Sequence, residues 1–269
     1  MNDHKVALIT GGSSGIGEAT ARCFAANGFR VAMAARRLDR LENVKQEIEA
    51  AGGEALAVQA DVTSQEEIRT MVGETLSAWN QVDVLVNNAG FGRFGWLEEL
   101  DPDRDIRAQI DVNLTGTILA AREVLPHMIE RRSGHIINMA SMAGYVATPT
   151  YTVYAASKYG LRGFTEALRR EVRVWGVRVS AVFPGGVDSP EFAEKAGVQK
   201  RKTKITTPQW LRLSLDDVAQ AVFRVSQRSS GMVVLPWLMR FSILSNRLFP
   251  GVLDRTIEKR FVRPERGLD

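Results

Sequence analysis

The 269-residue chain has the composition of a globular protein, with 45% hydrophobic and 25% charged residues. This length suits one large domain or two small ones, and the apolar share can fill a core. A formal net charge of +4 gives only weak support for an anionic ligand or surface. The support for nucleic acid is weaker still, so we expect no nucleic-acid partner. The single cysteine, Cys23, excludes an internal disulfide and fits a reducing compartment.

The amino-terminal residues predict neither a signal peptide nor a membrane span. A short polar segment leads directly into a strand-like stretch and a glycine cluster. That stretch is too short for the apolar core of a signal peptide, and no run of 18 apolar residues occurs in the chain. The expectation is therefore a cytoplasmic protein.

The hydrophobic periodicity switches repeatedly between strand-like and helical stretches. Glycines and caps mark the boundaries: Gly52-Gly53 ends one helix, and Ser64 with Glu67 forms a capping box that begins the next. In chain order, strands are expected at 5–9, 30–35, 55–59, 82–86, 135–139, 177–183 and 232–235. The corresponding helices are expected at 15–27, 38–51, 64–79, 98–110, 113–132, 151–175 and 214–228.

Strands that alternate with helices at this spacing predict a doubly wound, Rossmann-like α/β domain with a parallel sheet covered on both faces. No linker or repeat interrupts the pattern, so we expect a single domain over residues 1–236. Such sheets bind ligands at the carboxyl ends of their strands. Residues that carry chemistry should therefore follow strands directly.

The first motif of this kind is a glycine-rich turn after the first expected strand, Thr10-Gly11-Gly12-Ser13-Ser14-Gly15-Ile16-Gly17. Gly11 permits a tight turn, Gly15 lets the backbone approach a pyrophosphate, and Gly17 lets helix and strand pack closely. The helix N-terminus offers unpaired N–H groups to phosphates. A turn that binds nothing is the alternative, but the strand–turn–helix context favours a dinucleotide site.

Tyr154 and Lys158 lie one helical turn apart, so their side chains share a face. A phenol with an ordinary pKa of about 10 is a poor base near neutrality. A neighbouring ammonium would lower this pKa and bring Tyr154 towards a useful acid/base range. Ser141, after the fifth expected strand, could donate a hydrogen bond to a substrate oxygen. The alternative for Tyr154 is a helix residue that only covers the core.

The glycine spacing and the six further ordered motifs given below resemble the short-chain dehydrogenase/reductase family, in its short single-domain branch. The resemblance covers residues 5–235. It rests on Asp61-Val62, Asn87-Asn88-Ala89-Gly90, Asn113, Ser141, Tyr154-Ala155-Ala156-Ser157-Lys158 and Pro184-Gly185. It implies an oxidoreductase that interconverts a carbonyl and a primary or secondary alcohol with a nicotinamide cofactor.

The resemblance also implies roles for individual residues. Tyr154 would be the general acid/base, Lys158 would bind the nicotinamide ribose, Ser141 would orient the substrate oxygen, and Asn113 would hold a proton-relay water. Besides Tyr154 and Lys158, the implied cofactor contacts are Gly11, Ser13, Ser14, Gly15, Ile16, Gly17, Arg36, Arg37, Asp61, Val62, Asn87, Ala89, Pro184, Val187 and Ser189.

The residues after the second strand indicate which nicotinamide cofactor is used. NAD-specific family members have an acidic residue where this chain has Ala35, and two arginines follow, Arg36 and Arg37. A guanidinium can bind two oxygens of the 2′-phosphate, and Ser13 or Ser14 could add a hydrogen bond. We therefore expect NADP(H), with Arg36 making the larger contribution. The alternative is that both arginines are solvated.

The expected substrate pocket is apolar and aromatic, which suits a bulky hydrophobic carbonyl or alcohol. Its expected wall consists of Phe91, Phe94, Trp96, Met142, Tyr145, Tyr151 and Phe192. The loop over 190–210 is a candidate lid. Its basic residues, which could bind an acidic group but which we expect to be solvated, are Lys200, Arg201, Lys202 and Lys204. No cluster has metal-ligand spacing, so no metal is expected.

The last part of the chain, 237–269, departs from the tail of many short family members. Its apolar residues share one helical face, with arginines beside it: Trp237, Phe241, Leu244 and Leu248, against Arg240 and Arg247. We expect this amphipathic extension to pack on the core, a partner subunit or the pocket mouth. The alternative is an anionic membrane surface. A homo-oligomer is expected, with a dimer at least as favoured as a tetramer.

Two other functions fit parts of the pattern. A catalytically silent dinucleotide-binding regulator would share the fold, but the intact Ser141, Tyr154, Lys158 and Asn113 disfavour it. A membrane-surface, lipid-handling reductase would make the extension central and would retain the enzyme. A longer-branch epimerase is disfavoured by the glycine spacing and by too few residues for a separate substrate domain.

Overall fold

The computed structural model describes residues 4–197, 207–228 and 231–268. At its centre lies a seven-stranded parallel sheet with the strand order β3-β2-β1-β4-β5-β6-β7. The strands are β1 Val6–Thr10, β2 Arg30–Ala35, β3 Glu54–Gln59, β4 Val84–Asn87, β5 Gly134–Met139, β6 Val177–Pro184 and β7 Met232–Leu235. The order reverses direction beside β1, which confirms the predicted doubly wound, Rossmann-like fold.

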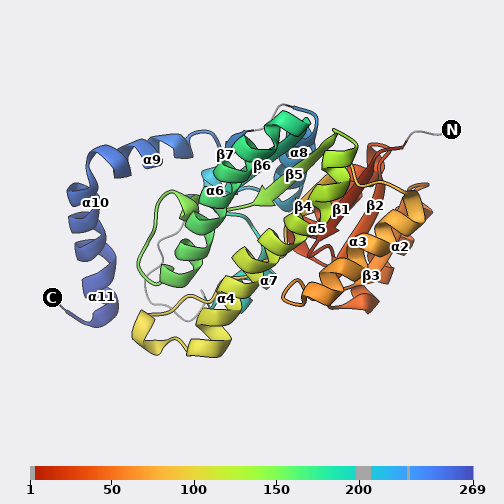
Figure 1. Cartoon of the computed structure of the whole chain (residues 1–269). Coiled ribbons are helices and arrows are strands. Elements are labelled where there is room, and N and C mark those ends of the chain that lie inside the picture. Colours follow the sequence, from red (N-terminus) through yellow and green to blue (C-terminus); the bar gives the residue numbers. More distant parts are fainter. Residues whose placement is uncertain (1–3, 198–206, 229–230, 269) are drawn as a thin grey trace.

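Helices cover both faces of the sheet (Figure 1). One face packs against α3 Gln65–Trp79, α5 Gly116–Glu130 and α6 Thr152–Val172. The other face packs against α1 Gly15–Ala26, α2 Leu38–Ala50 and α8 Leu215–Ser226. Neighbouring strand residues serve opposite layers: Leu8 belongs to the first core, and Ala7 and Ile9 belong to the second. All five residues of β1 are therefore buried.

The region before α5 differs from the prediction of two separate helices at 98–110 and 113–132. A short 3₁₀ turn, Leu97–Glu99, is followed by one unbroken helical run. That run consists of a π segment Pro102–Arg107, α4 Ala108–Ile110, a second π segment Asp111–Thr115, and α5. The wider π turns shift the hydrophobic period, so a continuous helix resembles two in the sequence.

After β7 the chain forms an arm that leaves the sheet edge and runs beside the body (Figure 1). The arm consists of α9 Met239–Leu248, α10 Pro250–Ile257, a π segment Glu258–Val262 and α11 Arg263–Arg266. Met239 and Ile243 of α9 pack against the cluster that contains Phe183, whereas the four apolar residues that the sequence analysis placed on one face are exposed. Across the described ranges, no helix has both the length and the apolarity needed to cross a membrane.

Gly17 allows the first turn of α1 to lie directly against the glycine-rich turn. This contact fixes the position of the glycine-rich turn. A Cβ at Gly17 would clash with the carbonyl oxygen of Gly11 and with the Asn88 side chain. We predict that Gly17→Ala destabilises the protein by about 2–3 kcal/mol, because backbone cannot move aside as a flexible side chain can. Chemical denaturation measures this.

The matched control is Gly163→Ala, at an exposed position of α6 where a Cβ meets nothing within 4 Å. Because alanine is the better helix former, this variant should be more stable by up to about 1 kcal/mol. Equal stabilities for Gly17→Ala and the unmodified protein would contradict the proposed packing constraint.

Candidate active site

The predicted catalytic and cofactor-binding residues lie together at the carboxyl ends of the strands, as expected for a parallel α/β fold. The glycine-rich turn follows β1, Asn88 and Ala89 follow β4, Ser141 follows β5, and Gly185 follows β6. Tyr154 and Lys158 come from the first turns of α6. The edge therefore brings together segments that are far apart in sequence.

The glycine-rich turn is held open by contacts from the strand ends. Gly11 has φ +69° and Gly15 has φ +60°, a region that glycine adopts without strain. The Asn88 side chain donates to the carbonyl oxygens of Thr10 and Gly11 at 3.1 and 3.3 Å. The Thr10 hydroxyl accepts from the backbone N–H groups of Asn88 and Ala89, each at 3.1 Å. These bonds leave the N-terminus of α1 facing the site.

Asn87 at the end of β4 ties neighbouring elements together. Its Nδ2 donates to Oδ1 of Asn138 on β5 at 2.9 Å and to the Thr117 carbonyl of α5 at 3.5 Å. Its Oδ1 is buried and accepts no hydrogen bond from the described residues. The position thus has a structural role and also offers an unused acceptor.

Tyr154 packs against three other aromatic side chains. Phe94, Phe192 and Tyr151 surround its ring with centroid distances of 5.5, 6.2 and 6.4 Å. Only 8% of Tyr154 is exposed. This burial raises the pKa of the phenol to about 12, and a hydrogen bond from Ser141 offsets only part of the effect.

Lys158 is buried beside Tyr154 without a carboxylate partner among the ion pairs of the described chain. Its Nζ donates to the Met139 carbonyl at 2.9 Å and lies 5.7 Å from the centroid of the Tyr154 ring. Burial lowers the pKa of Lys158 to about 8. The expected lowering of the Tyr154 pKa by this ammonium is therefore not obtained, because burial dominates at both residues.

Asn113 lies in the second π segment and holds the turn that follows β4. Its Oδ1 accepts from the Phe91 N–H and its Nδ2 donates to the Phe91 carbonyl, each at 2.9 Å. Nδ2 also donates to Ser157 of α6 at 3.2 Å. The side-chain amide thus fixes the turn that borders Lys158, a contact that the sequence analysis missed. The water link to Lys158 stays a prediction.

Arg37 is bound by residues from two sides of the site. Its guanidinium donates to the Ser13 and Ser14 hydroxyls at 3.2 and 2.8 Å and to the Glu191 carboxylate at 2.9 Å. Hydrogen bonds from Lys195, Arg37 and Ser14 lower the pKa of Glu191 to about 2. Sequence reasoning missed Glu191, since the only local signal was its spacing of four from Lys195, which is typical of a surface pair.

Arg36 is much freer than Arg37. Its side chain is 78% exposed, and its ion pair with Asp61 is loose, at 3.8 Å. Asp61 is otherwise held within its own turn, where its Oδ1 accepts from the Thr63 N–H and hydroxyl at 2.9 and 2.8 Å. The neighbouring Val62 is 8% exposed. The guanidinium of Arg36 can therefore reorient towards an anion at little cost.

The segment after β6 crosses over the glycine-rich turn. Pro184 ends the strand, Val187 forms a bridge with Leu213, and Ser189 begins α7 Pro190–Ala196. A Cβ at Gly15 would lie 3.9 Å from the Ser189 hydroxyl, so the two segments are close neighbours. Ser189 thus lies within reach of a ligand bound at the turn.

Six of the seven predicted pocket residues fall into three groups, and the seventh, Phe91, lies in the turn that Asn113 holds. Phe94 stacks on Tyr151 at 3.7 Å, and both join Phe192 around Tyr154. Met142 and Tyr145 instead belong to the cluster that contains Phe183 of β6. Trp96 contacts the arm, where its ring lies 6.3 Å from Phe261 and under the guanidinium of Arg266. Of the candidate lid, the described part includes α7, and the basic residues Lys200, Arg201, Lys202 and Lys204 lie outside the described residues.

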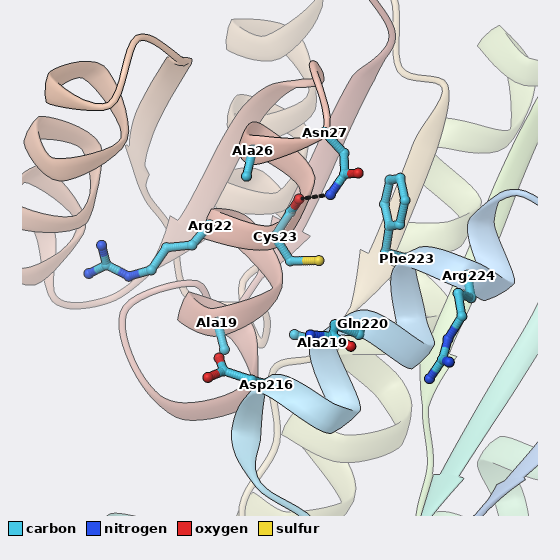
Figure 2. Close-up of a pocket in the computed structure, with 10 residues that line it drawn as sticks. All are labelled: Ala19, Arg22, Cys23, Ala26, Asn27, Asp216, Ala219, Gln220, Phe223 and Arg224. Carbon is cyan, nitrogen blue, oxygen red and sulfur yellow. Dashed lines mark hydrogen bonds between the residues drawn. The ribbon is translucent and has the colours of Figure 1, made fainter.

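A groove of about 590 Å³ lies between α1 and α8, away from this edge (Figure 2). It is lined by Ala19, Arg22, Cys23, Ala26, Asn27, Asp216, Ala219, Gln220, Phe223 and Arg224, none of which was a predicted site residue. Burial raises the pKa of the Cys23 thiol, which stays protonated near neutrality. The groove therefore offers no activated nucleophile.

Comparison with solved structures identifies relatives of the whole α/β body. A metagenomic short-chain oxidoreductase in complex with NADP is 35% identical, with a TM-score of 0.72 over 86% of this chain and 97% of the other. The actinorhodin polyketide ketoreductase with NADPH is 32% identical, with a TM-score of 0.79 over 87% and 96%. Both matches leave more than a tenth of this chain uncovered.

Sequence comparison agrees with the structural relatives. A 3-oxoacyl-[acyl-carrier-protein] reductase of Synechocystis is 43% identical over 67% of this chain and 73% of the relative. An uncharacterized oxidoreductase of Staphylococcus saprophyticus is 37% identical over 81% and 88%. The family model described as short chain dehydrogenase matches residues 5–200. The chain therefore belongs to the short-chain dehydrogenase/reductase family, as its ordered motifs predicted.

Proposed function

We propose that this protein is an NADP(H)-dependent oxidoreductase that interconverts a carbonyl and an alcohol on a bulky hydrophobic substrate. One arrangement carries the proposal: Tyr154 is hydrogen-bonded to Ser141 and lies beside the buried Lys158, at the strand edge that holds the glycine-rich turn. The NADP and NADPH complexes of the structural relatives support the choice of cofactor.

The residues present fit a phosphorylated dinucleotide. The glycine-rich turn offers backbone N–H groups at the start of α1, and Arg36, Ser13 and Ser14 offer donors for a 2′-phosphate. Lys158 uses one of its three donors on the Met139 carbonyl, which leaves two for ribose hydroxyls. When bound, the nicotinamide supplies or accepts the hydride.

Tyr154 and Ser141 would act on the substrate oxygen. With a pKa of about 12 the phenol is protonated near neutral pH, so Tyr154 holds the proton that the oxygen of a carbonyl would receive during reduction. Ser141 would donate a second hydrogen bond to the same oxygen, and the ammonium of Lys158 would stabilise the phenolate that remains. Asn113 would connect Lys158 with solvent through a water molecule.

The aromatic side chains around Tyr154 would select the substrate. Phe94, Tyr151 and Phe192 present apolar rings and exclude water from the phenol, which favours a hydrophobic group next to the carbonyl. These rings come from three different segments, and α7 already lies against the body through Phe192 and Glu191. The expected homo-oligomer and cytoplasmic location stay predictions.

Tyr154→Phe removes the proposed proton donor and leaves the ring packing nearly intact. We predict that turnover falls by about 10²-fold or more, with little change in the dissociation constant of NADPH. Initial rates with a panel of hydrophobic ketones and aldehydes test this, together with a binding titration. The control is Tyr151→Phe, which keeps the neighbouring aromatic ring. Tyr151 has no lysine four residues after it, so the loss of its hydroxyl should not remove the proton donor. If Tyr151→Phe loses activity instead, the proton donor is wrongly assigned.

Arg36→Ala removes the freest guanidinium near the expected 2′-phosphate. We predict that kcat/KM falls about tenfold to a hundredfold with NADPH and changes little with NADH, since each charge-assisted hydrogen bond contributes about 1.5–3 kcal/mol. Arg107→Ala is the control, because the Arg107 side chain is as exposed as that of Arg36, at 77% compared with 78%. This variant should keep the kcat/KM of the unmodified protein with NADPH. An unmodified enzyme that prefers NADH would contradict the cofactor assignment.

Glu191→Gln removes a carboxylate that shares its donors with the expected phosphate. Glu191 is hydrogen-bonded to Arg37, which also binds Ser13 and Ser14, so an incoming 2′-phosphate competes with it. We predict that the variant binds NADPH about tenfold more tightly and NADH with little change. Equilibrium titration measures both affinities. Glu194→Gln on the exposed side of α7 makes the same charge change and should have no such effect.

A further inference from the structure

The arm carries a row of large apolar side chains that are exposed. On α9 and the residue pair before it, Trp237, Phe241 and Leu244 are 63%, 62% and 52% exposed. The row continues through Leu248 into α10, where Val252 is 64% exposed. A soluble surface rarely gathers this many large apolar groups without a binding partner.

The opposite side of the arm is fastened to the body, so the exposed row has a fixed direction. Met239 and Ile243 of α9 pack into the cluster that contains Phe183. At the far end, Phe261 is 5% exposed and lies against Trp96. The arm is thus held at both ends. The exposed row is a built surface and not the unpacked side of a loose tail.

The arm also concentrates the positive charge of the protein. Residues 237–269 contain seven basic and four acidic side chains, which gives this segment +3 of the net charge of +4. On α9, Arg240 and Arg247 are exposed, and helical spacing puts them along one border of the apolar row. Aromatic and aliphatic residues bordered by arginine form the surface that an interfacial membrane helix presents.

A second copy of the chain is the other occupant that such a face could accept, and charge disfavours it. The rest of the chain carries only +1, so it offers no acidic complement overall, and two arms in contact would bring like charges together. An anionic bilayer provides both an apolar layer for the row and negative headgroups for the arginines. We therefore propose that the arm docks the protein on an anionic membrane surface, with the row from Trp237 to Val252 inserted at the headgroup level.

The position of the arm suggests what docking achieves. One end of the arm joins the cluster that contains Tyr145, and the other end touches Trp96, so it spans two predicted walls of the substrate pocket. A hydrophobic carbonyl dissolved in the bilayer would then enter beside the arm. This last step rests on the proposed function, whereas docking itself does not.

Vesicle co-sedimentation of the full-length protein tests docking without any use of its activity. The two vesicle types are phosphatidylcholine alone and an equal mixture of phosphatidylcholine and phosphatidylglycerol. We expect binding to the mixture only, weakened at ~1 M salt, where charges are screened beyond about 3 Å. The double variant Phe241→Ser/Leu244→Ser should bind at least about tenfold more weakly. Because both side chains are exposed, the variant should fold normally, and its thermal unfolding checks this.

Val174→Ser is the matched control, since Val174 is 69% exposed in the 3₁₀ turn Arg173–Trp175 that follows α6, and this variant should bind vesicles as the unmodified protein does. Two results would overturn the proposal. One is an unmodified protein that ignores the mixed vesicles. The other is a Phe241→Ser/Leu244→Ser variant that changes the oligomer mass measured by analytical ultracentrifugation without lipid, because a second copy would then cover the row.

Discussion

The candidate site depends on keeping the Lys158 ammonium inside the protein with one hydrogen bond, to the Met139 carbonyl. Removing a charge from water costs several kcal/mol unless it is paired, and here the cost shows as a pKa lowered to about 8. The stability that offsets this cost comes from the two apolar layers around the sheet. A ligand whose hydroxyl oxygens accept from Lys158 would recover part of it, so cofactor binding and the burial of this residue are energetically linked.

The periodicity and the ordered motifs predicted the sheet, its parallel strands and its ligand edge, because each depends on local sequence. Three properties were not predicted, and the first two of them depend on contacts between distant segments. The pKa of the Tyr154 phenol is higher than predicted because Phe94 and Phe192 help to bury it. Glu191 meets Arg37 across 154 positions of sequence. The helix over 102–130 is continuous, but its π turns displace the hydrophobic period. In the sequence this displacement resembles a break between two helices.

The two arginines after β2 show why residue type alone does not define a phosphate site. Both have the same charge and follow the same strand, yet Arg37 is already neutralised by Glu191 while Arg36 stays exposed. An arginine engaged with a carboxylate must exchange one anion for another, so its net contribution to binding is smaller than that of a solvated arginine. Since Glu191 belongs to α7, the exchange would also release the segment that covers the glycine-rich turn.

The arm shows a related limit on amphipathic patterns. One apolar face was predicted on α9 and was expected to meet protein, but the helix has two: Met239 and Ile243 meet the Phe183 cluster, and Phe241 and Leu244 face outward. Helical spacing gives the position of a face around the axis and does not say what covers it. Here the two faces together explain the geometry. The inner face holds α9 against the edge of the sheet, and the outer face, bordered by Arg240 and Arg247, is left exposed.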